Sequence, residues 1–289
     1  MAPIHQNFMA KSEMFNSLSL CAQEVRRYDW DRFLFTLFAP MEVREDIYTL
    51  LAFNAEISKI GGIVSEPLLG QMRIQWWQDV IDQIYDGSFR GFRGHYIADH
   101  LPNLIRRHSL TKSLIDQLIE ARSSEFTEWP PKNKEALIEY IFGISAVPNI
   151  LLLEIIGNQA GLEEKATDLG IAWGLTNLIR AFPTMARQGR SPLPIDLLGD
   201  DQHFTNFNSD LGRAIESIYC IAKEYLDKSR AAKIQSGIEH RSVFLSSILN
   251  EYYLNQIFKS GYNPYSINTK TRTAYRQIIV GIGALFRTY

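Results

Sequence analysis

The most informative segment of the chain reads LGIAWGLTNLIRAFPTMARQGRSPLP and extends from Leu169 to Pro194. Apolar residues recur at intervals of three and four from about residue 163 to Ala181, which predicts an amphipathic helix. A proline ring clashes with the carbonyl four residues earlier in a continuing helix, and Pro183 places that clash at Ile179. The helix is therefore expected to end or kink at Pro183, ahead of a loop at residues 188–207 that is rich in glycine and proline.

The same helical spacing recurs along most of the chain, whereas strand-like alternation with hairpin turns is scarce. Helices are expected over residues 43–57, closed by Gly61 and Gly62, and over residues 67–84, ended by Gly87. Further helices are expected over residues 111–121, 134–156, 210–236, 241–259 and 271–287, with a kink at Pro148. The chain has 289 residues, of which 46% are hydrophobic, so it can bury a large core. These features predict an all-α protein with a flexible N-terminal segment, residues 1–18, and a single helical domain, residues 19–289.

Charge and hydropathy exclude several classes of protein. The 30 basic and 32 acidic residues give a net charge of −2, which argues against a general nucleic-acid binder. No run of eighteen apolar residues occurs, so a membrane span is not expected. The apolar segment Tyr275–Phe286 has Arg272, Arg276 and Arg287 in or beside it, so it is either a final core helix or a peripheral membrane-binding one.

Two segments of the chain resemble the squalene/phytoene synthase family. Residues 169–194 align without gaps to the family pattern LGxAxQLTNILRDVxEDxxxGRxYLP. The sequence LAFNAEISKI at residues 51–60 resembles the helix that ends in YAFCRxxDDxxD, and residues 66–87 resemble the helix that follows it. The matching positions of the first segment are Gly170, Ala172, Leu175, Thr176, Asn177, Arg180, Gly189, Arg190, Leu193 and Pro194. The resemblance covers residues 20–287 and implies an isoprenoid synthase-type helical barrel around a central apolar cavity.

The resemblance also implies where chemistry would take place. The family's enzymes join two prenyl diphosphates head to head, and aspartates on two facing helices hold the magnesium ions that draw off diphosphate. The corresponding positions are Ser58, Lys59 and Gly62 in the first motif and Ala181, Thr184 and Met185 in the second. None is acidic, and Lys59 reverses the charge, which disfavours a metal cation. We therefore expect no catalytic residue, no metal and no cofactor, as in a pseudoenzyme.

Within the family, the chain most resembles the phytoene-synthase-like assembly factors of respiratory complex I. The shared sequences are AFNAE at residues 52–56, GQMRIQW at residues 70–76 and RTY at residues 287–289. The resemblance implies a non-catalytic role in building the NADH dehydrogenase, with complex I subunits or other assembly factors as partners. The implied location is cytoplasmic and peripheral on the inner membrane, or the mitochondrial matrix side of that membrane in a eukaryote.

Several basic residues are candidates for binding an anionic ligand without metal. Lys59, Arg73, Arg180 and Arg190 are expected to line the cavity mouth together with Asn177, where they would hold an anionic lipid or a prenyl diphosphate. The alternative for Arg180 is a structural salt bridge with Glu56 or Glu154, because a buried guanidinium needs an anionic partner.

A second function stays open from the sequence. The chain would be an active head-to-head prenyltransferase if relocated carboxylates held magnesium. The nearby candidates for such ligands are Glu56, Asp79, Asp82 and Asp168.

Overall fold

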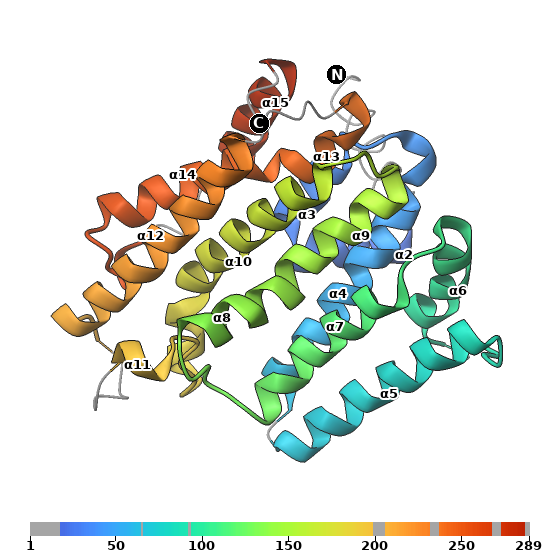
Figure 1. The fold of residues 1–289 in the computed structure, drawn as a ribbon, viewed down its shortest axis with the longest axis horizontal. Helices are drawn as coiled ribbons and strands as arrows, with labels where there is room; N and C mark the ends of the chain where they lie inside the picture. The colour runs from blue at the N-terminus through green and yellow to red at the C-terminus, as the bar shows by residue number, and fades with distance from the viewer. Residues whose placement is uncertain are drawn as a thin grey trace, which may run out of the picture.

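The computed structural model describes residues 18–64, 66–91, 94–198, 206–231, 237–267 and 273–286. Within these ranges every regular element is a helix, as predicted (Figure 1). All but the last residue of the predicted N-terminal segment lies outside the described residues. The α-helices are α2 (Leu20–Tyr28), α3 (Trp30–Thr36), α4 (Arg44–Ile63), α5 (Pro67–Asp86), α6 (Tyr96–His108), α7 (Lys112–Ser123), α8 (Lys134–Ile141), α9 (Val147–Ile156), α10 (Leu162–Arg187), α11 (Ile195–Leu198), α12 (Ser209–Ala231), α13 (Arg241–Phe244), α14 (Ser246–Lys259) and α15 (Thr273–Phe286).

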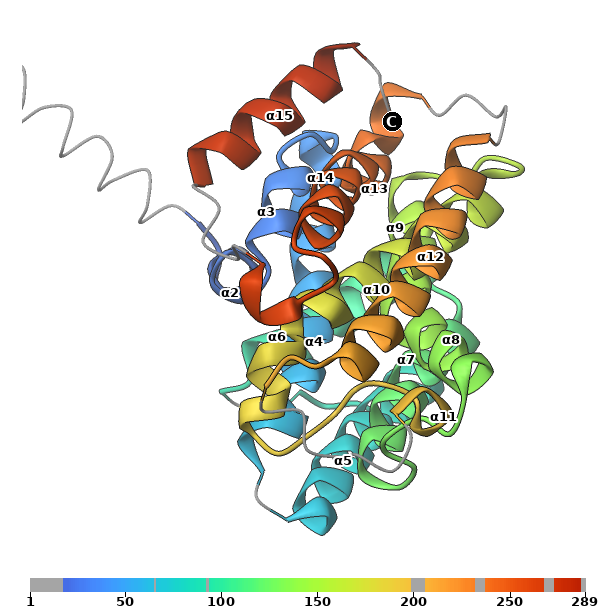
Figure 2. The same ribbon diagram turned by 90° about the vertical axis from the view of Figure 1, so that its left-hand side faces the viewer.

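Helix α10 contains most of the informative segment and passes through the middle of the molecule (Figures 1 and 2). It packs along α12 and also contacts α9 and α14. Gly170 allows the backbone of α10 to pass close to the backbone of Ala146, because a Cβ at residue 170 would lie 2.4 Å from the Cα of Ala146. The Ser145 hydroxyl donates to the Gly170 carbonyl over 2.7 Å across the same contact. Any side chain at residue 170 would therefore push the two helices apart.

The predicted helix end at Pro183 is wrong, because α10 continues through Pro183 to Arg187. Phe182, next to the proline, is fully buried and its ring packs edge-on against Tyr265 with a centroid distance of 6.0 Å. Burial of this ring stabilises the helical course and outweighs the loss of one backbone hydrogen bond.

The irregularity expected at Pro148 appears just before the proline. A π-helical segment, Phe142–Ala146, separates α8 from α9. Such a bulge absorbs the carbonyl that a proline ring would otherwise hit. By length and composition the stretch Lys134–Ile156 could cross a membrane, but 67% of its most apolar window is buried inside the protein. Its apolarity is accounted for by the core.

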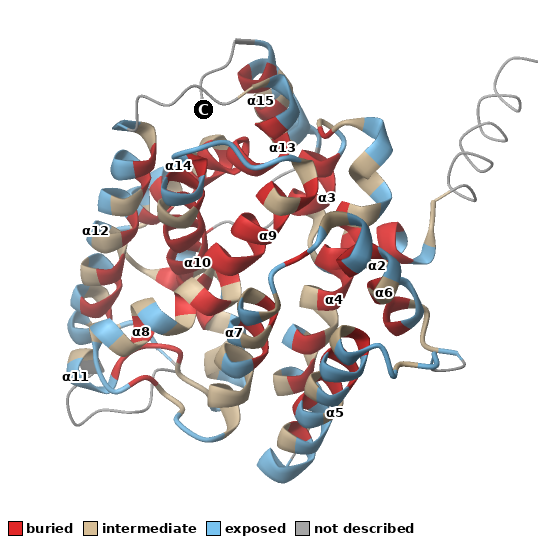
Figure 3. Cartoon of the chain, turned by 45° about the vertical axis from the view of Figure 1, so that its right-hand side comes forward, coloured by how far each residue is buried: buried red, intermediate tan, exposed pale blue. Residues whose placement is uncertain are grey.

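A second group of helices completes the wall around the centre. Helix α4 contacts α2, α6, α9 and α5, and α5 in turn contacts α7. The buried faces of α4, α9 and α10 point toward one another, while α5 exposes much of its outer face (Figure 3). A 3-10 turn, Ser124–Phe126, follows α7 and contacts the first half of α5.

Four helices were not predicted from the sequence: α2, α3, α6 and the four-residue α11, which lies in the expected loop at residues 188–207. The first two are short and are joined by Asp29, which ends α2 and caps α3 by accepting from the Arg32 amide over 3.1 Å. Most residues of α3 are buried on all sides, so no amphipathic period is visible in its sequence. The predicted helix at residues 241–259 is also interrupted, at Leu245.

Candidate functional site

A cavity of about 380 Å³ lies between α4, α8, α10 and the α2–α3 junction. This volume falls in the range of small-molecule sites, about 300–1,000 Å³. Ser58 and Gly62 of α4 line it on one side, and Ala181 and Met185 of α10 line it on another. Positions that the resemblance assigns to the two motifs therefore share one cavity, and none of the four carries a carboxylate. Lys59 and Thr184 are not among the lining residues.

Lys59 belongs instead to a closed ion cluster beside the cavity. Its ammonium group pairs with the carboxylates of Glu24, from α2, and Glu56, one turn earlier in α4. It also lies 4.5 Å from the centre of the Tyr28 ring. Burial acts to lower the pKa of Lys59, but the hydrogen bonds to Glu24 and Glu56 outweigh it and the pKa is raised. We call Lys59, Glu24 and Glu56 the Lys59 cluster.

The α2–α3 junction contributes an ion pair to the cavity lining, in which Arg32 is buried and the Asp29 side chain is 35% exposed. Asp29 and Arg32 both line the cavity, with 3.7 Å between Oδ2 and Nε. Burial raises the pKa of the Asp29 carboxyl above its usual range, although Arg32 opposes this. Burial also lowers the pKa of the Arg32 guanidinium, and the positive charge of Arg122 adds to that effect. Nη1 of Arg32 is buried without a hydrogen-bond partner.

A second ion pair joins α7 to the turn that follows it. Arg122 donates from Nη1 to Glu125 Oε1 over 2.8 Å, and the Tyr140 hydroxyl donates to the same oxygen over 2.8 Å. The side chains of Arg122 and Glu125 are 11% and 8% exposed. Burial and the Glu125 charge raise the pKa of Tyr140, so the phenol stays protonated. Nε of Arg122 has no hydrogen-bond partner although it is buried.

Arg190 connects the loop after α10 to the end of α4. Its Nη1 donates to the Gly61 carbonyl over 2.7 Å, and its Nη2 lies 3.5 Å from Glu125 Oε2. The guanidinium also lies 5.6 Å from the centre of the Trp129 ring. A Cβ at residue 61 would come within 2.6 Å of that same Glu125 oxygen. Arg190 lines the cavity, as predicted from the sequence, and it also connects the end of α4 to Glu125 in the turn after α7.

These groups form one cluster with a surplus of positive charge. We call Arg32, Arg122 and Arg190 with Asp29 and Glu125 the cavity arginine cluster; it sets three guanidinium groups against two carboxylates. Apolar residues such as Leu51, Ile144 and Leu178 line the same cavity. Its wall is therefore mixed, whereas the family resemblance implied an apolar cavity. Buried guanidinium atoms without partners are costly, and an anion would satisfy them.

The donors around the cavity do not fit magnesium. Among the described residues, no three His, Cys, Asp or Glu side chains gather in a group that could hold a metal ion. The two carboxylates in the lining are already held by arginines, whose positive charge opposes a cation.

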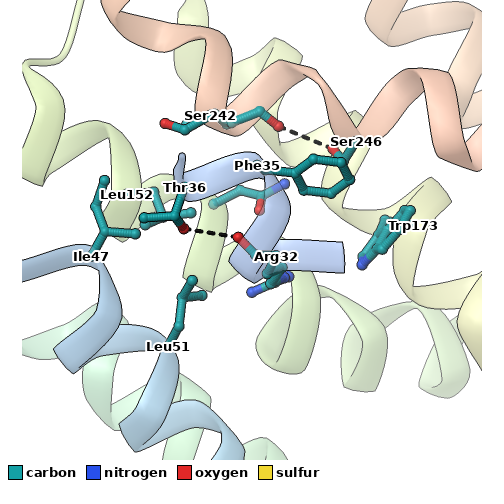
Figure 4. Close-up of a pocket in the computed structure, with 11 residues that line it drawn as sticks. Arg32, Phe35, Thr36, Ile47, Leu51, Leu152, Trp173, Ser242 and Ser246 are labelled. Carbon is teal, nitrogen blue, oxygen red and sulfur yellow. Dashed lines mark hydrogen bonds between the residues drawn. The ribbon is translucent and has the colours of Figure 1, made fainter. Parts of the chain in front are cut away.

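Arg32 also borders a second, much smaller cavity of about 10 Å³. Figure 4 shows Arg32 between Leu51 and Trp173, two residues that line both cavities. The space has room for about one water molecule. The buried Ser242 hydroxyl borders it and lacks a hydrogen-bond partner. Arg32 thus lies between the large cavity and the small one.

The remaining predicted ligand residues are dispersed. Asn177 lines the cavity and accepts a hydrogen bond from Arg180, which itself is not part of the lining. The Arg180 guanidinium stacks on the Tyr253 ring, 3.5 Å from its centre. No ion pair joins Arg180 to Glu56 or Glu154 in the described part of the chain; Glu154 accepts from the Thr111 hydroxyl over 2.6 Å. Arg73 is exposed on α5 and lies outside the lining.

None of the proposed relocated carboxylates lines the cavity. Glu56 belongs to the Lys59 cluster, and Asp79 accepts from Gln75 on the exposed face of α5. Asp82 pairs with Lys112 over 2.7 Å, and Asp168 is half-buried near the start of α10. Asp79 and Asp82 are neighbours on α5, whereas Glu56 lies on α4 and Asp168 on α10.

Sequence reasoning missed Asp29, Arg32, Arg122 and Glu125. One signal was available for Arg122, which lies three, four and seven residues after the buried Ile119, Leu118 and Ile115. It therefore occupies the apolar stripe of α7, where a charged residue is unexpected.

The chain is similar in sequence to known proteins. The family model for squalene/phytoene synthase matches residues 25–276. A protein named NADH dehydrogenase (ubiquinone) complex I, assembly factor 6, from Bos taurus is 28% identical over 82% of this chain and 72% of its own length. The protein of that name from Homo sapiens is 24% identical over 93% of this chain and 82% of its own length. The homologue from Drosophila melanogaster is 26% identical over 84% of this chain and 75% of its own length.

Solved structures show the same fold. A dehydrosqualene synthase in complex with a ligand superposes with a TM-score of 0.78 and 15% identity, covering 93% of this chain and 96% of its own. The squalene synthase HpnC from Alicyclobacillus acidocaldarius gives a TM-score of 0.73 and 19% identity, covering 85% of this chain and 94% of its own. The chain belongs to the squalene/phytoene synthase family.

Proposed function

We propose that this chain is an assembly factor for respiratory complex I, which uses the family's helical barrel to bind a ligand and not to catalyse prenyl transfer. Relatives named complex I assembly factor 6 match 82–93% of the chain in cattle, fruit fly and human. The partners would be complex I subunits or other assembly factors. The site of action would be peripheral on the inner membrane, on the matrix side in a mitochondrion.

One observation carries the non-catalytic part of the proposal. The motif positions that face the cavity are Ser58, Gly62, Ala181 and Met185, which offer no carboxylate for a metal. Ionisation of a prenyl diphosphate needs the leaving group neutralised, and magnesium supplies that charge in enzymes of this kind. The cavity arginine cluster supplies fixed positive charge instead, which binds an anion without activating it in concert with a metal.

The proposed ligand is a lipid or isoprenoid with an anionic head. The unpartnered Nη1 of Arg32 and Nε of Arg122 would hold the head, and the apolar wall at Leu51, Ile144 and Leu178 would contact the tail. A mass spectrum of small molecules released from the purified protein identifies the ligand. Recovery of the protein with no such molecule, and no thermal stabilisation by prenyl diphosphates or anionic lipids, would contradict this part.

The assembly role is tested by removing the gene from a host that respires through complex I. We expect lower NADH oxidation and less assembled complex I on a native gel, with both restored by the wild-type gene. Succinate oxidation serves as the control, because it bypasses complex I. Normal complex I levels in the deletion strain would contradict the proposal.

The competing function is head-to-head prenyl transfer, which the synthase structures with the same fold favour. The purified protein is incubated with farnesyl or geranylgeranyl diphosphate and magnesium, and released pyrophosphate is measured. We expect none above background. Turnover that disappears in Glu125→Gln or Glu56→Gln would establish an enzyme and overturn the non-catalytic assignment.

A further inference from the structure

An apolar tip projects where α4 meets α5. Its residues are Ile63, at the end of α4, and Leu68, Leu69 and Met72, in the first turns of α5; they are 46–64% exposed. Figure 3 shows the exposed N-terminal end of α5 extending beyond its neighbours. Gly70, between them, is buried beneath the Phe126 ring, so this end of α5 is anchored while its outer face stays uncovered.

The tip directly follows residues that line the cavity. Gly61 and Gly62, directly before Ile63, line the cavity, and Arg190 binds the Gly61 carbonyl. Large apolar side chains in solvent are unfavourable unless another surface covers them. Their position near a cavity whose lining includes Leu51, Ile144 and Leu178 is suited to an occupant that itself carries an apolar layer.

One exposed basic residue, Arg73, lies beside the tip, and a second, Arg187, lies at the end of α10. Arg73 is exposed next to Met72 in the chain, and Arg187 is exposed at the end of α10, close to the cavity-lining Gln188. Glu66 is the exposed acid in this region of α5, directly before its first residue. Protruding apolar residues with flanking arginines are the pattern of a surface that contacts anionic bilayers.

We infer that the α4–α5 tip docks on an anionic lipid bilayer, with the cavity mouth turned toward the membrane. This inference rests on the peripheral membrane placement proposed above and names the surface responsible for it. Ile63, Leu68, Leu69 and Met72 enter the boundary between headgroups and acyl chains, and Arg73 and Arg187 contact lipid phosphates.

Helix α15 is the rival surface. Its exposed apolar residues are Tyr275, Ile278, Ile282 and Leu285. Its single cation within residues 273–286, Arg276, is engaged by Asp31 over 2.6 Å, so no charge in the described part of the helix selects an anionic bilayer. Figures 1 and 2 place α15 at the end of the molecule opposite the N-terminal end of α5. It provides a matched control.

The test is co-sedimentation of the full chain with vesicles of phosphatidylcholine, alone or mixed with phosphatidylglycerol. We expect the wild type to bind the mixed vesicles and Leu68→Ser/Met72→Ser to lose about tenfold or more in affinity. Arg73→Gln should lose about fivefold, and only on the mixed vesicles. The control Ile278→Ser/Ile282→Ser should bind as the wild type does. All five side chains are exposed, so circular dichroism and melting temperature should stay unchanged.

Three outcomes would overturn the inference. The wild type could fail to bind either kind of vesicle, or a tip variant could bind as well as the wild type. The third is loss of binding in the α15 variant alone. A tip variant with normal vesicle binding that fails to restore complex I would assign the tip to a protein partner. The vesicle assay contains no complex I, so its failure is distinguishable from failure of the assembly role.

Discussion

Two charged clusters lie near the same cavity, and they differ in balance. The Lys59 cluster sets two carboxylates around one ammonium group, outside the cavity lining. The cavity arginine cluster sets three guanidinium groups against two carboxylates, inside the lining, and leaves buried donor atoms without partners. A cluster whose donors are all engaged holds helices together, whereas one with donors to spare can also accept a ligand.

The difference revises the role of Lys59. The sequence placed it at a lost metal position and indicated repulsion of cations from the cavity. In the structure its charge is neutralised locally, and the positive field of the cavity comes from arginines on α3, α7 and the loop after α10. Four variants or conditions separate the two clusters, and they are ordered by the size of the expected effect.

The largest effect is expected from Arg122→Met. Glu125 is 8% exposed and would keep only Arg190, 3.5 Å away, and the Tyr140 hydroxyl. Removal of one partner of a buried ion pair costs about 3–5 kcal/mol. Chemical denaturation measures the loss. The double variant Arg122→Met/Glu125→Gln should recover part of it, because the uncompensated charge is gone. Equal stability of the single variant and the wild type would show that the pair is not buried as described.

The next effect is stabilisation by an anion. Pyrophosphate with a metal chelator should raise the melting temperature by about 5 °C at a hundredfold excess over its Kd, which corresponds to about 2.7 kcal/mol. The shift should vanish in Arg32→Met and persist in Lys59→Met. Sulfate at matched ionic strength controls for general salt effects. A shift that appears only when magnesium is added would contradict metal-free binding.

Lys59→Met is expected to destabilise the fold by about 1–2 kcal/mol. Glu24 and Glu56 would lose their common cation while their side chains are 15% and 31% exposed. The methionine keeps the contact with Tyr28. Glu56→Gln should cost less, since it removes the more exposed carboxylate and leaves Lys59 paired with Glu24. The rise in melting temperature with pyrophosphate is the second readout. Loss of that rise in a Lys59 variant would show that the two clusters form one binding site.

The smallest expected effect is a change of folding stability with pH that is caused by the titration of Asp29. Its folded-state pKa is raised, mainly by burial, above the unfolded value. The contribution to stability is therefore fully present below the ordinary carboxyl pKa and declines as pH rises through the folded value. Asp29→Asn should gain stability relative to the wild type as pH rises from acid to neutral. Thermal unfolding of both proteins across this pH range measures the difference. A constant difference across that range would contradict the raised pKa.

Much of the fold could be predicted because helical periodicity is a local property. Residues 43–57 and 67–84 were assigned to helices that the structure extends over Arg44–Ile63 and Pro67–Asp86. Pro67 occupies the first turn of α5, and Gly87 ends it in the left-handed conformation with a φ of 79°. Short buried helices such as α3 lack that periodic signal, and the end predicted at Pro183 was overridden by burial of Phe182.

The candidate site was predictable only in part. The altered motif positions were found because they sit in sequence patterns, and Ser58, Gly62, Ala181 and Met185 do meet at one cavity. The partners of the charged residues were not found. Glu24 is 35 residues from Lys59, and Gly61 is 129 residues from Arg190.

The amino-acid sequence by itself determined most of the helices and the family, since each depends on residue type at short spacing. Only the tertiary structure decided which charges are neutralised, which guanidinium atoms remain unsatisfied and which apolar residues stay exposed at the α4–α5 tip. Those outcomes depend on desolvation and on contacts between distant segments, and neither quantity is encoded in the spacing of neighbouring residues.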